Sequence, residues 1–201
     1  MQRTHNRTTS LTFAALMTAL AIILSYFPEI PLAFFAPWLK LDFSFTPLLL
    51  LGFSIGPGMM AIALLITNLV HIIGGTTSGV GELANMLIGL AFLLPPTLLY
   101  RRKKTRGNAL LGMGIGVVLM MFTGVLANRF ILLPVFFGPG FEGALQGMGM
   151  SLNGYLFGAI APFNAVKGLI NSLLVFMLYK RLSLLMKEVD EQQEKSAVHV
   201  S

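Results

Sequence analysis

An apolar stretch near the end of the sequence, residues 159–180, indicates what kind of fold the chain can adopt. It is long enough to cross a bilayer as a helix, because the hydrocarbon core requires about 20 apolar residues. It nevertheless contains Asn164 and Lys167. A lysine at membrane depth is costly and usually faces a water-filled or ligand-filled interior. The two residues are three positions apart and lie on one helix face, so we expect this helix to present an amide and an ammonium group to an interior site.

The composition is that of a membrane protein. Of the 201 residues, 55% are hydrophobic and only 11% are charged, whereas soluble proteins carry about 25% charged residues. The net charge of +6 comes from basic clusters beside the apolar runs. This distribution is typical of membrane helices whose basic flanks lie on the cytoplasmic side, and it does not indicate nucleic-acid binding. The sequence contains no cysteine, which excludes disulfides, thiolate metal sites and thiol nucleophiles.

The apolar segments predict an all-α integral membrane protein with six transmembrane helices. Residues 45–81 contain no Asp, Glu, Lys or Arg, and Gly56-Pro57-Gly58 divides this run into two helices. The first of these is too short to cross upright unless the preceding loop enters the bilayer. We expect residues 134–158 to form a long outer loop. The predicted helices are residues 11–27, 45–55, 57–73, 82–100, 108–133 and 159–180.

The basic residues fix the expected orientation. Five of the six residues in 101–106 are basic, which places this loop in the cytoplasm. Six spans put both termini on the same side, together with eleven of the fourteen basic residues. We therefore predict cytoplasmic termini and one transmembrane domain, residues 1–187, followed by a polar, disordered tail over 188–201.

This topology brings polar residues of several helices to a similar depth near the outer surface. Three helices each present a carboxamide there, and an amide can donate and accept hydrogen bonds at once. We predict a pocket open to the outside for a ligand with several donors and acceptors. The polar residues at this level are Asn68, His71, Glu82, Asn85, Asn128, Arg129, Asn164 and Lys167, with Asp42 at the mouth of the second helix.

Other interpretations of these residues stay open. Each Asn could instead bond a neighbouring helix, His71 could be interfacial, and Lys167 could pair only with Glu82 in a structural subunit that binds no ligand. The membrane-level residues provide no carboxylate pair in helical register and no HExxH, so we predict that the chain is not an enzyme. It also lacks the GxxxxGK[ST] phosphate-binding motif, so transport driven by ATP would require another polypeptide.

Small residues line one side of the first helix. Ala15 and Ala19 are four positions apart, a spacing that lets another helix approach closely. Packing within this protein and docking of a partner are both consistent with that spacing.

Several motifs follow one another in an order that resembles a known family. The chain resembles the S components, the substrate-binding membrane subunits, of energy-coupling-factor (ECF) vitamin transporters, and among them the riboflavin-specific type. The combination of GELAN with PFNxxK is the most specific part of the resemblance. The matching strings are LKLDFS (39–44), GFSIGP (52–57), NLVHII (68–73), GELANMLIG (81–89), ANRFILLP (127–134) and APFNAVKG (161–168).

The resemblance implies a bundle of six helices whose outward-facing pocket is capped by the loop between the first two helices. It implies that Asn128, Asn164 and Lys167 contact the flavin, with Glu82 and Asn85 nearby and residues of the first loop against the ring system. The ligand-binding set that we expect is Asn128, Asn164, Lys167, Glu82, Asn85, Trp38, Leu41, Asp42, Asn68 and Arg129.

The resemblance also implies partners. Family members bind the vitamin alone and then associate with a membrane coupling protein and two cytosolic ATPases, which use ATP. Small residues of the first helix serve as the docking face, a role that Ala15 and Ala19 match. The chain needs no cofactor of its own in this scheme and lies in the bacterial cell membrane as a multi-pass protein.

Two positions depart from the family pattern. Phe45-Thr46-Pro47 follows LDFS where an acid is expected before the proline, and Arg129 replaces an aromatic residue beside Asn128. Arg129 and Lys167 could favour flavin mononucleotide. We predict a high-affinity riboflavin-binding S component that captures the vitamin from outside. The alternatives are an S component for pantothenate or thiamine, or a structural subunit without a ligand.

Overall fold

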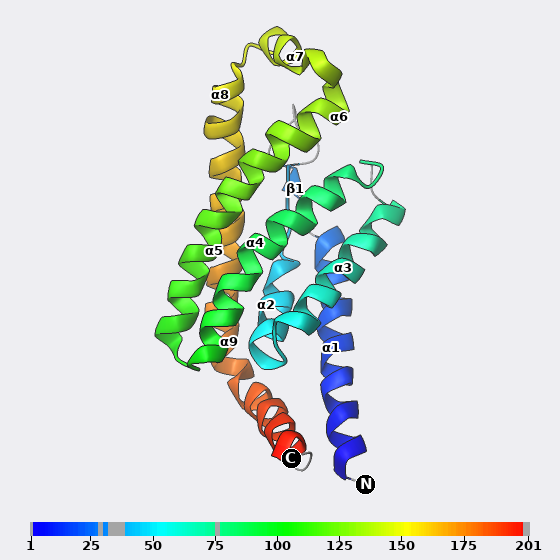
Figure 1. Ribbon diagram of the computed structural model, residues 1–201, viewed down its shortest axis with the longest axis vertical. Coiled ribbons are helices and arrows are strands. Elements are labelled where there is room, and N and C mark those ends of the chain that lie inside the picture. The colour runs from blue at the N-terminus through cyan, green and yellow to red at the C-terminus, as the bar shows by residue number, and fades with distance from the viewer. Residues whose placement is uncertain (1, 28–29, 32–38, 75–76, 199–201) are drawn as a thin grey trace.

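A computed structural model describes residues 2–27, 30–31, 39–74 and 77–198, with side chains described for 8–27, 30, 39–74 and 77–179. Figure 1 shows a helical bundle in which the start of α1 and the end of α9 lie at the same end. The loop over residues 101–106 lies toward that end, which the positive-inside rule assigns to the cytoplasm. We call this the inner end and the opposite one the outer end.

The elements follow the predicted order. A two-stranded antiparallel ribbon, β1 (Ile30–Pro31) and β2 (Lys40–Leu41), pairs Ile30 with Leu41 between the first two helices. The six main helices start and end within a few residues of most of the expected positions. They are α1 (Gln2–Tyr26), α2 (Phe45–Ser54), α3 (Pro57–Gly74), α4 (Val80–Arg102), α5 (Arg106–Ala127) and α9 (Ala161–Val198).

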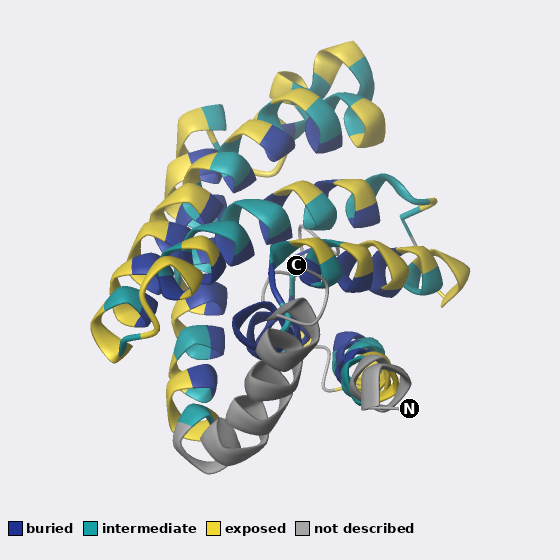
Figure 2. Ribbon diagram, turned by 60° about the horizontal axis from the view of Figure 1, so that its bottom comes forward, coloured by how far each residue is buried: buried dark blue, intermediate teal, exposed yellow. Residues whose placement is uncertain are grey.

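The six-helix membrane architecture is confirmed. Within the residues that the structure describes, five helical segments are long and apolar enough to cross a bilayer, and α2 is a shorter apolar helix. All ten residues of α2 are buried, because α1, α3, α4 and α9 pack around it. Figure 2 shows the buried residues on the faces of the helices that point toward one another. The segments that meet the length criterion are Thr8–Tyr26, Pro57–Gly74, Val80–Arg102, Arg106–Gly147 and Leu152–Tyr179.

The predicted outer loop over residues 134–158 is wrong. Most of this segment is helical, and it projects beyond the outer ends of α3 and α4 (Figure 1). Pro134 lacks an N–H and directly follows the π-helical residues 128–132 and Leu133 within one continuous helical segment. Gly138 turns the chain with φ of +69°. The elements of this outer cap are η1 (Asn128–Leu132), α6 (Leu133–Phe137), η2 (Gly138–Gly140), α7 (Phe141–Gly147), α8 (Leu152–Tyr155) and η3 (Leu156–Ile160).

The hairpin of α4 and α5 packs closely because α5 carries glycines on the contact face. A Cβ atom at Gly112 would overlap the Pro96 backbone, and one at Gly116 would overlap the Phe92 carbonyl oxygen. This close approach fixes the inner half and the middle of α5 against α4, and Asn128 follows at the outer end of the same helix. The prediction of a disordered tail from residue 188 stays a prediction, since α9 is described as a helix to Val198 but without its last side chains.

Candidate functional site

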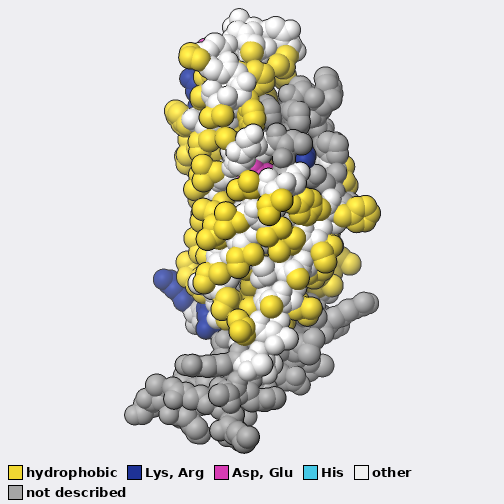
Figure 3. All heavy atoms as spheres, turned by 90° about the vertical axis from the view of Figure 1, so that its right-hand side faces the viewer, with side chains coloured by type: hydrophobic (Ala, Val, Ile, Leu, Met, Phe, Trp, Pro, Cys, Tyr) yellow, Lys and Arg dark blue, Asp and Glu magenta, His cyan; other side chains and the backbone are white. Residues whose placement is uncertain are grey.

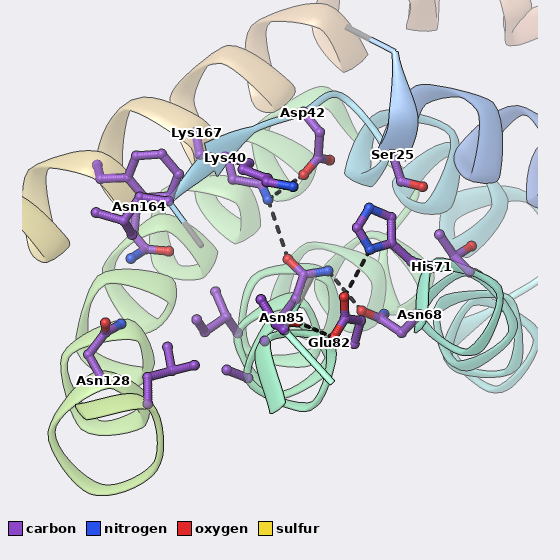
Figure 4. Close-up of a pocket in the computed structure, with 18 residues that line it drawn as sticks. Ser25, Lys40, Asp42, Asn68, His71, Glu82, Asn85, Asn128, Asn164 and Lys167 are labelled. Carbon is purple, nitrogen blue, oxygen red and sulfur yellow. Dashed lines mark hydrogen bonds and ion pairs between the residues drawn. The ribbon is translucent and has the colours of Figure 1, made fainter. Parts of the chain in front are cut away.

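A pocket opens in the outer half of the bundle, with about 830 Å³ of space when the volume at its open mouth is included. Its walls come from the end of α1, the β2 segment, α3, α4, the α5–η1 junction and α9 (Figure 4). Apolar side chains, including Ile88, Leu132 and Phe163, alternate with polar ones. The polar residues that line it are Ser25, Lys40, Asp42, Thr67, Asn68, His71, Thr77, Glu82, Asn85, Asn128, Asn164 and Lys167.

Lys167 lies at the centre of the polar network, only 4% exposed. Its Nζ atom is 2.6 Å from Asp42 Oδ2 and donates to Asn85 Oδ1 at 3.3 Å. It also lies 4.8 Å from the centre of the Phe45 ring, within the range of a cation–π interaction. The structure therefore corrects the alternative in which Lys167 pairs only with Glu82, because its carboxylate partner is Asp42.

Asp42 is held in place by the segment that follows it. Its Oδ1 atom accepts hydrogen bonds from the Ser44 N–H at 3.0 Å and the Ser44 hydroxyl at 2.6 Å. Asn171, fully buried one turn after Lys167, donates to the Asp42 backbone carbonyl at 3.2 Å. Thr46 donates to Asn171 Oδ1 at 2.9 Å. This set ties the segment after β2 and the start of α2 to α9, and it presents a fixed carboxylate to Lys167.

A second cluster lies at the outer edge, between α3 and α4. Glu82 accepts from the Thr77 hydroxyl at 2.5 Å, and its Oε1 atom is 3.1 Å from His71 Nδ1. The His71 ring stacks on Tyr26 of α1 with centroids 4.7 Å apart. Deeper in the pocket, Asn85 Nδ2 donates to Asn68 Oδ1 at 3.0 Å. Each of these side chains therefore links one pocket wall to another.

The opposite wall carries the two remaining carboxamides. Asn128 begins the π turn η1, donates to the Gly124 carbonyl at 2.9 Å and accepts from the Tyr155 hydroxyl at 3.0 Å. Asn164 follows the π turn η3 and donates to the Ile160 carbonyl at 2.9 Å. Single π turns often occur at functional sites. Among the described residues nothing donates to Asn164 Oδ1, which leaves an acceptor in the pocket wall available to a ligand.

The structure brings seven of the ten predicted ligand-binding residues together at this pocket. Leu41 is buried but does not line it, and Trp38 lies outside the described residues. The role of all ten residues as ligand contacts stays a prediction. The seven are Asp42, Asn68, Glu82, Asn85, Asn128, Asn164 and Lys167.

Arg129 does not line the pocket, so the geometry lends no support to the prediction that it contacts the ligand. Its guanidinium pairs with Glu142 of α7 at 3.0 Å and lies 5.0 Å from the centre of the Phe141 ring, away from the pocket. Successive residues of a helical segment point about 100° apart. Asn128 faces the pocket, so its neighbour Arg129 is turned away from the pocket toward α7.

Sequence reasoning missed several lining residues. Ser25 and Thr67 are buried hydroxyl residues inside apolar helices, and nothing in the sequence distinguishes them from hydroxyls that bond their own helix. Lys40 and Phe163 lie within the LKLDFS and APFNAVKG strings, so those motifs could have indicated them. The described residues hold no cluster of three or more His, Asp or Glu side chains that could bind a metal ion.

The first helix separates its small residues by face. Ala14, Met17 and Ala21 are buried against the bundle, whereas Ala15 and Ala19 are exposed. The exposed pair is therefore not used for packing within the part of the protein that the structure describes.

Comparison with known proteins identifies the family. The family model described as ECF transporter, substrate-specific component, matches residues 9–179. The chain belongs to this family of S components. As an S component it is a substrate-binding, multi-pass membrane subunit of a transporter and not an enzyme. The predicted family and its fold class are confirmed.

Individual relatives agree with this assignment. The S component is 31% identical to the riboflavin transporter RibU of Staphylococcus aureus (strain TCH60), over 87% of this chain and 90% of the relative. It is 25% identical to the riboflavin transporter FmnP of Bacillus subtilis (strain 168), over 94% and 97% of the two chains. A solved structure, described as the S component of a bacterial ECF transporter, matches with a TM-score of 0.74 and 30% identity. That match covers 90% of this chain and 99% of the other.

Proposed function

We propose that this S component binds riboflavin in the outer pocket and delivers it inward with the other ECF subunits. The observation that carries the proposal is the convergence of Asn85, Asn128, Asn164 and Lys167 on one pocket among apolar walls. The flavin ring presents an edge of alternating carbonyl and N–H groups, and carboxamides can both donate to and accept from such an edge. The names of the relatives, which are riboflavin transporters, support the same ligand.

The charges at the pocket favour the vitamin over its phosphate. Two cations, Lys40 and Lys167, and two carboxylates, Asp42 and Glu82, line it, so the formal charge with neutral His71 is 2 − 2 = 0. Lys167 is already paired, and Arg129 lies outside the pocket. A flavin mononucleotide phosphate would meet a pocket with no net positive charge and two carboxylates in its wall, so its burial there is costly.

Delivery requires partners that the chain does not contain. We propose a membrane coupling protein and two cytosolic ATPases, because the sequence has no GxxxxGK[ST] motif with which to bind ATP itself. The exposed Ala15 and Ala19 offer a small-residue face for the coupling protein.

The test is flavin titration of the protein purified in detergent from cells supplied with riboflavin. We expect a yellow protein. Adding the ligand-free protein to riboflavin should quench the riboflavin fluorescence saturably, and flavin mononucleotide should bind much more weakly. Asn164→Ala removes the available Oδ1 acceptor, and a lost buried hydrogen bond of about 1–2 kcal/mol corresponds to roughly 5–30-fold weaker binding.

The matched control is Asn108→Ala, which removes a carboxamide that bonds the Leu99 and Lys103 carbonyls at the inner end. This variant should bind riboflavin like the wild type. Equal affinity of a folded Asn164→Ala variant and the wild type would contradict the site. A colourless protein that ignores riboflavin would contradict the ligand and direct the search to pantothenate or thiamine.

A further inference from the structure

A second hollow, separate from the flavin pocket, lies at the inner end between α5 and α9. It has about 260 Å³ of space when the volume open to its surroundings is included, and Phe53 of α2 contributes to its lining. Seven of the eight lining residues are apolar or aromatic, and the eighth is Arg106. The lining residues are Phe53, Arg106, Ala109, Leu110, Met113, Val175, Phe176 and Tyr179. We call it the inner groove.

The inner groove is open on the side that faces lipid. Leu110 and Phe176 flank it and are 51% and 50% exposed, whereas Met113 and Val175 are buried at 4% and 1%. The Tyr179 hydroxyl is already 2.7 Å from the Tyr100 hydroxyl, so the wall has no polar group that requires a ligand. An apolar chain is the occupant that such walls favour.

Arg106 carries the positive charge beside the inner groove. Arg106 makes no hydrogen bond or ion pair with any residue that the structure describes, and four more basic residues precede it in 101–104. Among the side chains described, the acidic ones are Asp42, Glu82 and Glu142, which all lie in the outer half. Figure 3 shows a broad apolar surface with Lys and Arg side chains near its lower edge.

The length of α5 places Arg106 and the inner groove at the depths of a lipid head group and its acyl chain. Arg106 begins α5 and Met113 lies seven residues further outward, a rise of about 10 Å. One leaflet contributes about 15 Å of hydrocarbon. A phosphate at Arg106 would therefore place an attached acyl chain along the apolar walls. Basic pockets between transmembrane helices on the cytoplasmic side are a known form of anionic lipid site.

We infer that the inner groove is a binding site for an anionic phospholipid of the inner leaflet, with its phosphate at Arg106 and an acyl chain between α5 and α9. Both features are required, because a zwitterionic lipid gains little from the basic residues and a free phosphate cannot fill the groove. The inference does not depend on the flavin ligand.

The experiment measures lipid retention by native mass spectrometry on the full-length protein in detergent, with phosphatidylglycerol or phosphatidylcholine added. We expect one phosphatidylglycerol to be retained in preference to phosphatidylcholine. Glycerol phosphate, which has the head group without the chains, should not displace it. Arg106→Gln should weaken retention by about fivefold, since one basic residue near the surface contributes about that factor.

The matched control is Lys103→Gln, which removes one charge from the same loop but does not line the groove. It should retain the lipid more strongly than Arg106→Gln does. Ala109→Leu fills the groove from the α5 side and should also lower retention. If Ala109→Leu does not fold, the lipid retention of Arg106→Gln alone tests the inference, because Arg106 is exposed and its replacement should not affect folding. A riboflavin affinity of Arg106→Gln equal to that of the wild type would show that this variant is folded.

Equal retention of the two lipids, or equal effects of Arg106→Gln and Lys103→Gln, would overturn the inference. Displacement by glycerol phosphate would show a site for phosphate alone and would also overturn it. Cross-linking of Phe176 to a partner protein, with lipid retention insensitive to Arg106→Gln, would assign the groove to a protein interface instead.

Discussion

Replacing Lys167 tests the buried ion pair on which the pocket is built. Lys167→Met keeps the length of the side chain but leaves Asp42 without its cation, at side-chain exposures of 5% and 11% for the pair. Removing one partner of a buried pair typically costs 3–5 kcal/mol. Asp42 retains two hydrogen bonds from Ser44, so we expect a loss near the lower limit, about 3 kcal/mol.

The double variant Asp42→Asn/Lys167→Met should recover most of that loss. The amide oxygen of Asn can still accept from Ser44, and replacing a buried pair by uncharged groups of similar volume is often neutral. We therefore expect stability within about 1 kcal/mol of the wild type and a coupling energy of about 2–3 kcal/mol in the double-mutant cycle. The assay is thermal and chemical unfolding in detergent, run beside riboflavin titration.

Binding and stability should separate in this series. The double variant should fold but bind riboflavin weakly, because the ammonium group is still missing from the pocket. A Lys167→Met variant as stable as the wild type, or a double variant as unstable as the single one, would refute the assignment of Asp42 as the partner of Lys167. Riboflavin binding by the double variant at wild-type affinity would refute Lys167 as a ligand contact.

Two further predictions concern small residues. Gly124→Ala places a Cβ atom against the Asn164 amide, whereas a Cβ atom at Gly114 meets open space. We expect Gly124→Ala to weaken riboflavin binding by about tenfold. Gly114→Ala should leave binding unchanged and should slightly stabilise the protein, because alanine has the higher helix propensity. Ala15→Trp or Ala19→Trp on the exposed face of α1 should leave riboflavin binding unchanged but reduce co-purification with the coupling protein. Titration and affinity purification measure the two effects, and normal assembly of the tryptophan variants would show that α1 docks through another face.

Much of this protein could be predicted from the sequence because a membrane imposes strong rules. Apolar length determines where helices can cross, and the basic loop over 101–106 orients them. A polar side chain inside an apolar helix needs a partner or a cavity, which is why Asn164, Lys167, Asn128 and Asn85 could be assigned to one pocket before their positions were known.

Other features depend on how each helix is oriented about its own axis and on the path of the segments between the helices. Asn128 and Arg129 are adjacent in sequence, yet one faces the pocket and the other pairs with Glu142 in the outer cap. The glycines of residues 134–158 suggested a loop, but packing within the cap stabilises short helices between them.

The partner of Lys167 shows the same limit most clearly. Glu82 and Asp42 were both available at the right depth, and sequence spacing cannot rank two carboxylates that lie on different segments. Which carboxylate pairs with Lys167 depends on the path of the chain after β2. Hydrogen bonds from Ser44 and Asn171 hold Asp42 beside Lys167 of α9. Thr77 and His71 instead hold Glu82 at the outer edge of the pocket. Composition and periodicity therefore determine that a polar pocket exists and which helices build it. Which side chains pair inside it is decided by hydrogen bonds between segments far apart in sequence.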